Sequence, residues 1–106
     1  MSVLVWVFDV PLDRSVGFRV VLQRGNRFQV PKLVRWEFKM EPGQVLRVRV
    51  GRANVYGQNE YFFGRMSRDG RITIPKLTVD LLQEDFDGKS LVGHVLEVHL
   101  SPSGHQ

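Results

Sequence analysis

The sequence contains an internal duplication, which limits how the chain can fold. Residues 27–33 (RFQVPKL) recur 44 positions later as residues 71–77 (RITIPKL), with four of the seven residues identical. Residues 43–50 (GQVLRVRV) then recur as residues 93–100 (GHVLEVHL), with four of the eight identical. Two copies are too few for a solenoid, which needs about three or more repeats to bury its faces. We therefore expect two halves that close on each other around a pseudo-twofold axis.

The length of the chain allows one domain built from these halves. A chain of 106 residues with 42% hydrophobic residues can form one core and is too short for two ordinary domains. We expect a single domain over residues 1–106, in which residues 1–16 add a strand and a turn. Residues 17–52 form the first repeat and residues 59–101 the second, with the joint between them at residues 51–59.

The sequence has no cysteine, which excludes disulfides, thiolate zinc sites and cysteine nucleophiles. Because nothing in the chain requires an oxidising compartment, we expect a cytoplasmic location. The apolar run at residues 3–8 is too short for a signal peptide or a membrane span, and it runs into Asp9, Pro11 and Asp13. We therefore expect no membrane association.

Local patterns predict a mostly β structure in which each repeat reads strand, strand, helix, strand. Residues 3–8 are β-branched and aromatic, which favours an extra N-terminal strand that ends at a turn over residues 11–13. Pro31 and Pro75 each follow a short strand and suit the first turn of a helix, because proline lacks a backbone donor and has a helical φ. The expected elements are strands at 18–23, 27–30 and 44–50 around a helix at 31–39, and strands at 61–67, 71–74 and 94–100 around a helix from 75 to about 84.

Charge is divided unevenly between the repeats. The net charge is +4, but residues 17–52 hold nine Lys or Arg against two Glu, whereas residues 59–101 hold five against seven acidic residues. A concentrated basic surface is the electrostatic footprint of a nucleic-acid-binding protein, because each neutralised phosphate releases counterions. We expect the first repeat to bind and the second to repel phosphate through a solvated acidic cluster of Asp80, Glu84, Asp85 and Asp87.

The order of these motifs resembles a known family. The sequence of a turn, an arginine, alternating apolar residues, a proline, a short helix and a glycine-led strand looks like the AbrB, MazE and SpoVT group of swapped-hairpin DNA-binding proteins. In that group two chains each supply one copy. With both copies on one chain, residues 17–101 look more like the single-chain RIFT barrel, a cradle-loop barrel also found in archaeal riboflavin kinases. The resemblance implies a monomeric, closed, six-stranded barrel with an extra N-terminal strand.

The resemblance also implies a DNA-binding site, because AbrB-like proteins contact DNA through arginines near the turn and along the short helix. The matching residues are Arg27, Arg71 and Arg35, and the adjacent basic residues complete the candidate set. That set is Arg24, Arg27, Lys32, Arg35, Arg47, Arg49, Arg68 and Arg71. The expected function is a non-catalytic transcription regulator or chromatin-associated factor with DNA as its partner and no cofactor or metal.

Other interpretations stay open. A small-ligand or nucleotide-binding barrel without catalysis follows from the kinase branch of the resemblance, and a protein-interaction module follows from the acidic second repeat. Arg27 and Arg71 also fit a structural role, in which each braces its turn by donating to backbone carbonyls or to an aspartate. His94 and His99 lie five apart on a predicted strand and so face opposite sides, which prevents them from sharing a metal.

The aromatic side chains are expected mostly in the core. Trp6, Trp36, Phe38 and residues 61–63 have the ring surfaces on which single-stranded bases stack. Burial explains most of them equally well. An exposed Trp36 beside Arg35 would favour the stacking interpretation.

Overall fold

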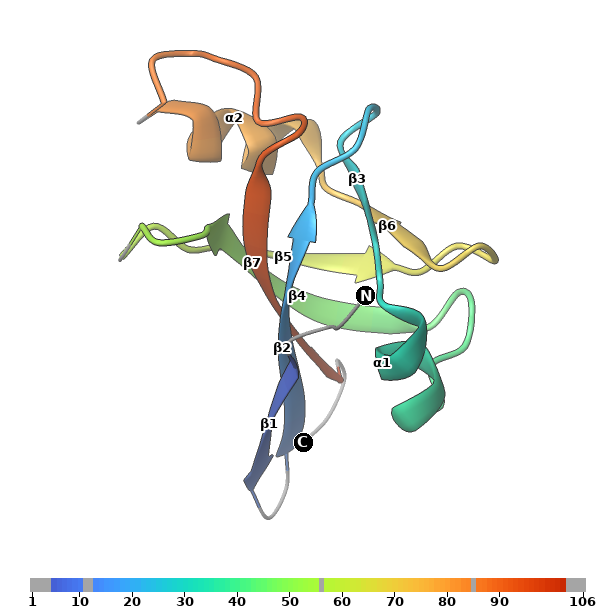
Figure 1. Ribbon diagram of the computed structural model, residues 1–106. Helices are drawn as coiled ribbons and strands as arrows, with labels where there is room; N and C mark the ends of the chain where they lie inside the picture. The colour runs from blue at the N-terminus through green and yellow to red at the C-terminus, as the bar shows by residue number, and fades with distance from the viewer. Residues whose placement is uncertain (1–4, 11–12, 56, 85, 103–106) are drawn as a thin grey trace.

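The computed structural model describes residues 5–10, 13–55, 57–84 and 86–102. The first repeat contains β2 (Asp13–Val21), β3 (Arg27–Gln29), α1 (Lys32–Glu37) and β4 (Val45–Arg52), as Figure 1 shows. The second contains β5 (Glu60–Arg65), β6 (Arg71–Thr73), α2 (Lys76–Glu84) and β7 (Val95–Pro102). A further strand, β1 (Val5–Val10), precedes both. The fold is mostly β, and each repeat has the expected order of strands and helix.

The strands form two antiparallel sheets and not the closed barrel expected from the resemblance. The larger sheet has the order β1-β2-β7-β4-β5, and β3 and β6 form a separate two-stranded ribbon. Isolated bridges at Gln23–Arg27 and Met66–Ile72 are the described links between the two sheets. Closure fails because β3 and β6 are three residues each and end before Pro31 and Pro75, where no backbone donor continues a ladder.

The strand pairing runs from one repeat to the other. β2 of the first repeat pairs with β7 of the second, and β5 of the second repeat pairs with β4 of the first. In the ribbon, the Val30 amide donates to the Gly70 carbonyl and the Ile74 amide donates to the Asn26 carbonyl, each at 2.8 Å. Both the two donors and the two acceptors are 44 positions apart, so the hydrogen bonds are equivalent. Neither repeat completes a sheet on its own.

The registers locate the pseudo-twofold axis. In the ribbon, Phe28 is opposite Ile72, its own equivalent in the second repeat. In the large sheet, Arg49 is opposite His99, which is its equivalent at an offset of 50. The axis therefore passes through both pairs and through the core between them. The ribbon and the outer face of the large sheet consequently lie on opposite sides of the molecule.

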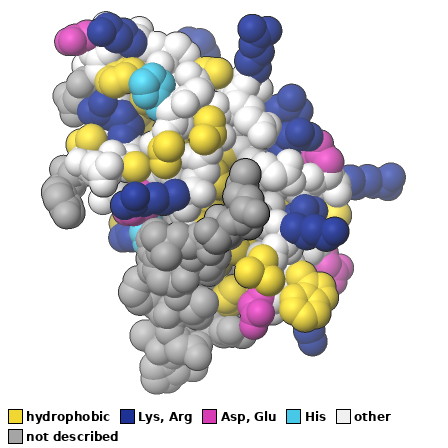
Figure 2. Space-filling view, viewed as in Figure 1, with side chains coloured by type: hydrophobic (Ala, Val, Ile, Leu, Met, Phe, Trp, Pro, Cys, Tyr) yellow, Lys and Arg dark blue, Asp and Glu magenta, His cyan; other side chains and the backbone are white. Residues whose placement is uncertain are grey.

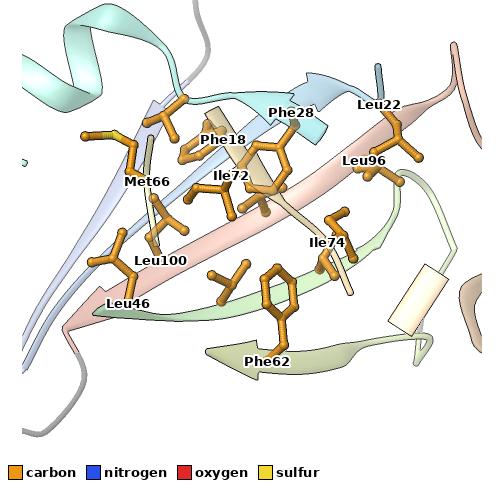
Figure 3. Close-up of a cluster of buried hydrophobic side chains, with 14 of the residues drawn as sticks. Phe18, Leu22, Phe28, Leu46, Phe62, Met66, Ile72, Ile74, Leu96 and Leu100 are labelled. Carbon is orange, nitrogen blue, oxygen red and sulfur yellow. The ribbon is translucent and has the colours of Figure 1, made fainter. Parts of the chain in front are cut away.

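The core fills the space between the inner face of the large sheet and the ribbon (Figure 3). Phe18 and Leu96 come from the sheet, Leu22 follows directly after β2, and Phe28 and Ile72 come from the ribbon; each is 0–1% exposed. The rings of Phe18 and Phe28 lie 6.3 Å apart between centroids. Burial of each such side chain stabilises the fold by about 1.5–3 kcal/mol. The ribbon is thus held to the sheet mainly by packing.

Several boundaries differ from the sequence-based expectation. β2 begins at Asp13, earlier than residue 18, because it pairs with β1 over its first residues. α1 ends at Glu37, because Lys39 has a left-handed φ of 50° and Pro42 follows closely. Within the described parts of the chain, no helix is long and apolar enough to cross a membrane. The predicted turn at residues 11–13 lies mostly outside the described residues, as does the start of the predicted strand at residues 3–8.

Candidate nucleic-acid interface

The predicted site residues lie on two opposite faces of the molecule. Arg27 and Arg71 lie on the outer face of the ribbon, with Arg24 and Arg68 in the turns at its two ends. We call this surface, with residues 24, 27, 29, 68, 71 and 73, the ribbon face. Arg47 and Arg49, in contrast, alternate with the buried Val48 on β4 and lie on the outer face of the large sheet. The predicted site residues therefore do not share one surface, and a ligand on a single face can contact only part of the set.

The ribbon face has a simple geometry. Arg27 is opposite Thr73, and Gln29 is opposite Arg71. The two arginines are thus diagonal neighbours across the pair of strands, typically about 7–8 Å apart between Cα atoms. Phe28 and Ile72 alternate with them and are fully buried, which turns the four polar side chains outward. The ribbon presents two cations on one diagonal and two neutral polar groups on the other.

Arg71 is held in place by a network of side chains. Its Nε donates to Gln23 Oε1 at 2.9 Å, and its Nη1 forms an ion pair with the carboxylate of Asp69. The hydroxyl of Ser67 also contacts this carboxylate and accepts a hydrogen bond from the Arg71 amide at 3.1 Å. The hydrogen bond from Ser67 and the charge of Arg71 lower the pKa of Asp69. These contacts fit the turn-bracing interpretation for Arg71.

Arg27 has a different environment from its equivalent. The position that matches Asp69 is Gly25, so the first turn has no carboxylate to pair with Arg27. Gly25 has a φ of 79°, and a Cβ there would lie 3.5 Å from Arg27 Nε. Arg27 is exposed and forms no ion pair with any described residue. Its guanidinium is therefore available to a ligand, whereas that of Arg71 is partly neutralised.

Helix α1 adds cations beside the second turn of the ribbon. The guanidinium of Arg35 lies against Gly70, whose Cβ, if present, would be 2.6 Å from the Arg35 Cζ. Among the described residues, Arg35 Nε is a buried donor with no hydrogen-bond partner. Lys32 is exposed at the first position of the helix. In Figure 2, dark-blue side chains run from the turn before β3, at the top, to the turn before β6 and α1, at the right.

The equivalent helix α2 lacks this arrangement. The position of Arg35 is occupied by Val79, which is 3% exposed, and Lys76 is within 3.4 Å of the carboxylate of Asp80. The position of Asp80 in the first repeat is occupied by Trp36, which is 75% exposed. The basic flank of the ribbon is therefore one-sided. Trp36 and Arg35 line an open hollow together with Glu37 and Lys39.

Sequence reasoning named the rings of residues 61–63 as possible stacking surfaces, but it expected most aromatic side chains in the core and did not place any of them beside Arg47 and Arg49. Tyr61 and Phe63 are exposed, and only Phe62, between them, is in the core. Strict alternation along a strand is the signal that separates them, since three consecutive residues cannot all face one side. No group of His, Asp and Glu in the described ranges is arranged to hold a metal ion. Of the acidic cluster, Asp80, Glu84 and Asp87 are exposed and Asp85 lies outside the described residues.

The fold defines a mostly antiparallel β protein of interlocked repeats with a cationic ribbon. No protein-family model matches the chain, and no curated protein does. Among solved structures, the chain is similar to the solution structure of PHS018 from Pyrococcus horikoshii, with a TM-score of 0.65 and 24% sequence identity. The match covers 79% of this chain and 86% of that chain. At this identity the likeness shows the fold alone.

Proposed function

We propose that the protein binds duplex DNA through the ribbon face, as a regulator or chromatin-associated factor. The observation that carries the proposal is a two-stranded ribbon with four arginines on its outer face and turns. Only one of them, Arg71, is paired with a carboxylate among the residues that the structure describes. The proposal is also supported by the resemblance to the AbrB-like proteins, whose arginines near the turn match Arg27 and Arg71.

The shape of the ribbon suits the major groove, which admits a two-stranded β-ribbon. The diagonal arrangement of Arg27 and Arg71 about the pseudo-twofold axis matches the local dyad of a duplex. Lys32 and Arg35 extend the contact to phosphates beside the groove. Because most of these groups are cations, phosphate contacts supply most of the affinity and sequence preference is weak.

The two ends of the ribbon contribute unequally. At the first turn Arg24 and Arg27 have no neighbouring carboxylate in the turn, whereas at the second turn Asp69 lies between Arg68 and Arg71. The carboxylate repels phosphate and competes for Arg71. We therefore expect stronger phosphate contacts at the first turn than at the second. Lys32 and Arg35 from α1 add further phosphate contacts.

The experiment is a fluorescence-anisotropy titration of labelled duplex DNA over a salt series. Six phosphate contacts, from Arg24, Arg27, Lys32, Arg35, Arg68 and Arg71, give a log–log slope of about −5. The double variant Arg27→Ala with Arg35→Ala is expected to flatten the slope by about two units. A matched control removes two exposed cations elsewhere, Arg47→Ala with Lys89→Ala, and leaves the slope unchanged. Absence of binding at low salt, or equal slopes for both double variants, would refute the proposal.

A further inference from the structure

The outer face of the large sheet exposes two large aromatic side chains on one strand. Tyr61 is 54% exposed and Phe63 is 69% exposed. Both lie on β5, two positions apart, so they face the same way and are separated by about 6.7 Å along the strand. Large aromatic side chains usually pack in the core, but of the three consecutive aromatic residues on β5 only Phe62 does so. The two exposed rings therefore need another explanation.

Arginines are interleaved with these rings. The pairing of β4 with β5 places Arg47 opposite Phe63 and Arg49 opposite Tyr61. The guanidinium carbon of Arg47 is also 5.2 Å from the centre of the Tyr61 ring. At the end of the strand, Arg65 is exposed and donates to the Gly43 carbonyl at 3.1 Å. We call residues 47, 49, 61, 63 and 65 the sheet face.

The duplication provides an internal control for this arrangement. At the equivalent place on the other side of the axis, Arg19 is opposite Glu97, and their side chains are 3.6 Å apart. Phe63 is the equivalent of Arg19, and Arg47 is the equivalent of Glu97. One side of the axis has an exposed ion pair where the other side has an exposed ring and a cation. The same antiparallel strand pairing forms around Arg19 and Glu97 as around Phe63 and Arg47. The strand pairing therefore does not require an aromatic ring and a cation at this position.

The chemistry of the sheet face selects one kind of ligand. Exposed rings beside a cationic track are the elements with which proteins bind single-stranded nucleic acid, through base stacking and phosphate contacts. A duplex keeps its base faces stacked inside and offers nothing to the rings. A second copy of the chain would bring the same three arginines against each other, and like charges oppose such an interface. The outward-facing residues of β4 and β5 include no carboxylate, and Glu97, on β7 of the same sheet, is paired with Arg19.

We infer that the sheet face is a second binding site, which takes single-stranded nucleic acid. Successive bases stack on Tyr61 and Phe63, and Arg47 and Arg65 contact the phosphates on either side. Arg49 lies opposite Tyr61 on the paired strand and adds a positive charge to the same face. Because the ribbon face lies on the opposite side of the core, the two sites act independently.

The test is an anisotropy titration of a labelled 12-nucleotide oligo-dT with the intact chain and its variants. Removal of one ring, by Tyr61→Ala or Phe63→Ala, is expected to weaken binding about tenfold. The conservative variants Tyr61→Phe and Phe63→Tyr keep a stacking surface and should bind like the original chain. Arg47→Ala is expected to flatten the salt slope by about 0.7, the value for one phosphate of a single strand.

Specificity controls separate this site from the proposed DNA site. Phe63→Ala should leave duplex affinity unchanged, and Arg27→Ala should leave oligo-dT affinity unchanged. Thermal unfolding of the ring variants should match the original chain because both rings are exposed. Failure to bind oligo-dT, or binding that survives loss of both rings, would overturn the inference. It would also be overturned by self-association in sedimentation that the ring variants abolish, because a second copy would then cover this face.

Discussion

Arg49 and His99 are opposite each other where the pseudo-twofold axis crosses the large sheet, and they are equivalent positions of the two repeats. Two arginines at this point would place like charges directly across the strand pair, which is destabilising. Partial burial lowers the pKa of His99, and the nearby charge of Arg49 lowers it further, while Glu97 raises it. At neutral pH the pair therefore carries one charge. The repeats have diverged at the position where strict symmetry would be least favourable.

Acid is expected to destabilise the protein through His99. Because the folded-state pKa lies below the ordinary value of 6.5, the unfolded chain binds more protons, and stability falls as pH decreases. This contribution is fully present above pH 6.5 and is lost as the pH falls through the folded-state pKa. The measurement is urea unfolding between pH 8 and pH 5.

The variant His99→Gln should lose this pH dependence, and His94→Gln serves as the control because His94 lies outside the β4–β7 pairing. The lowered pKa of Asp69 affects the pH dependence of stability only below pH 3.8, which is outside the range from pH 8 to pH 5. An unchanged pH dependence in His99→Gln would contradict the assignment.

The paired residues on the ribbon side of the axis should be the most costly to truncate. Phe28 and Ile72 are both fully buried and opposite each other. We expect Phe28→Ala to cost about 3–5 kcal/mol and Ile72→Ala about 2–5 kcal/mol of unfolding free energy, measured in urea. The exposed control Thr73→Ala should stay within about 0.5 kcal/mol. Losses of less than about 1 kcal/mol in both core variants would show that the ribbon does not close this core.

Alanine substitutions at Gly70 and Gly43 distinguish the effect of backbone strain from the effect of moving a side chain proposed to bind DNA. Both have a left-handed φ, of 82° and 85°, but a Cβ at Gly70 would meet the Arg35 guanidinium and a Cβ at Gly43 would meet nothing within 4 Å. We expect each alanine variant to lose about 1–2 kcal/mol from the left-handed conformation. The Arg35 side chain is flexible and moves away in Gly70→Ala.

Only Gly70→Ala should therefore also reduce the salt slope of duplex binding, by about one unit, as Arg35→Ala does. Equal slopes for the Gly70 and Gly43 variants would show that Arg35 does not contribute from this position. Adding Arg35→Ala to Gly70→Ala should have no further effect on the slope, because both changes remove the same contact.

Much of the secondary structure could be predicted because it depends on short-range patterns. Pro31 and Pro75 locate the starts of both helices, and the alternation of Val48 with Arg47 and Arg49 identifies a half-buried strand. The candidate site could be predicted only as a list of cations. Which cations share a face depends on strand pairing, and that pairing places Arg27 and Arg49 on opposite sides of the core.

The sequence by itself determined the duplication, the order of elements in each repeat and the excess of positive charge in the first, because all three can be read from the order of residue types without knowing which segments touch. Tertiary structure alone decided that the sheets do not close into a barrel, that Arg27 and Arg49 lie on opposite sides of the core, and that Tyr61 and Phe63 face outward. These outcomes depend on strand pairing and packing between segments that are not neighbours in the sequence. A local pattern contains no information on which of two alternating faces the other repeat will cover.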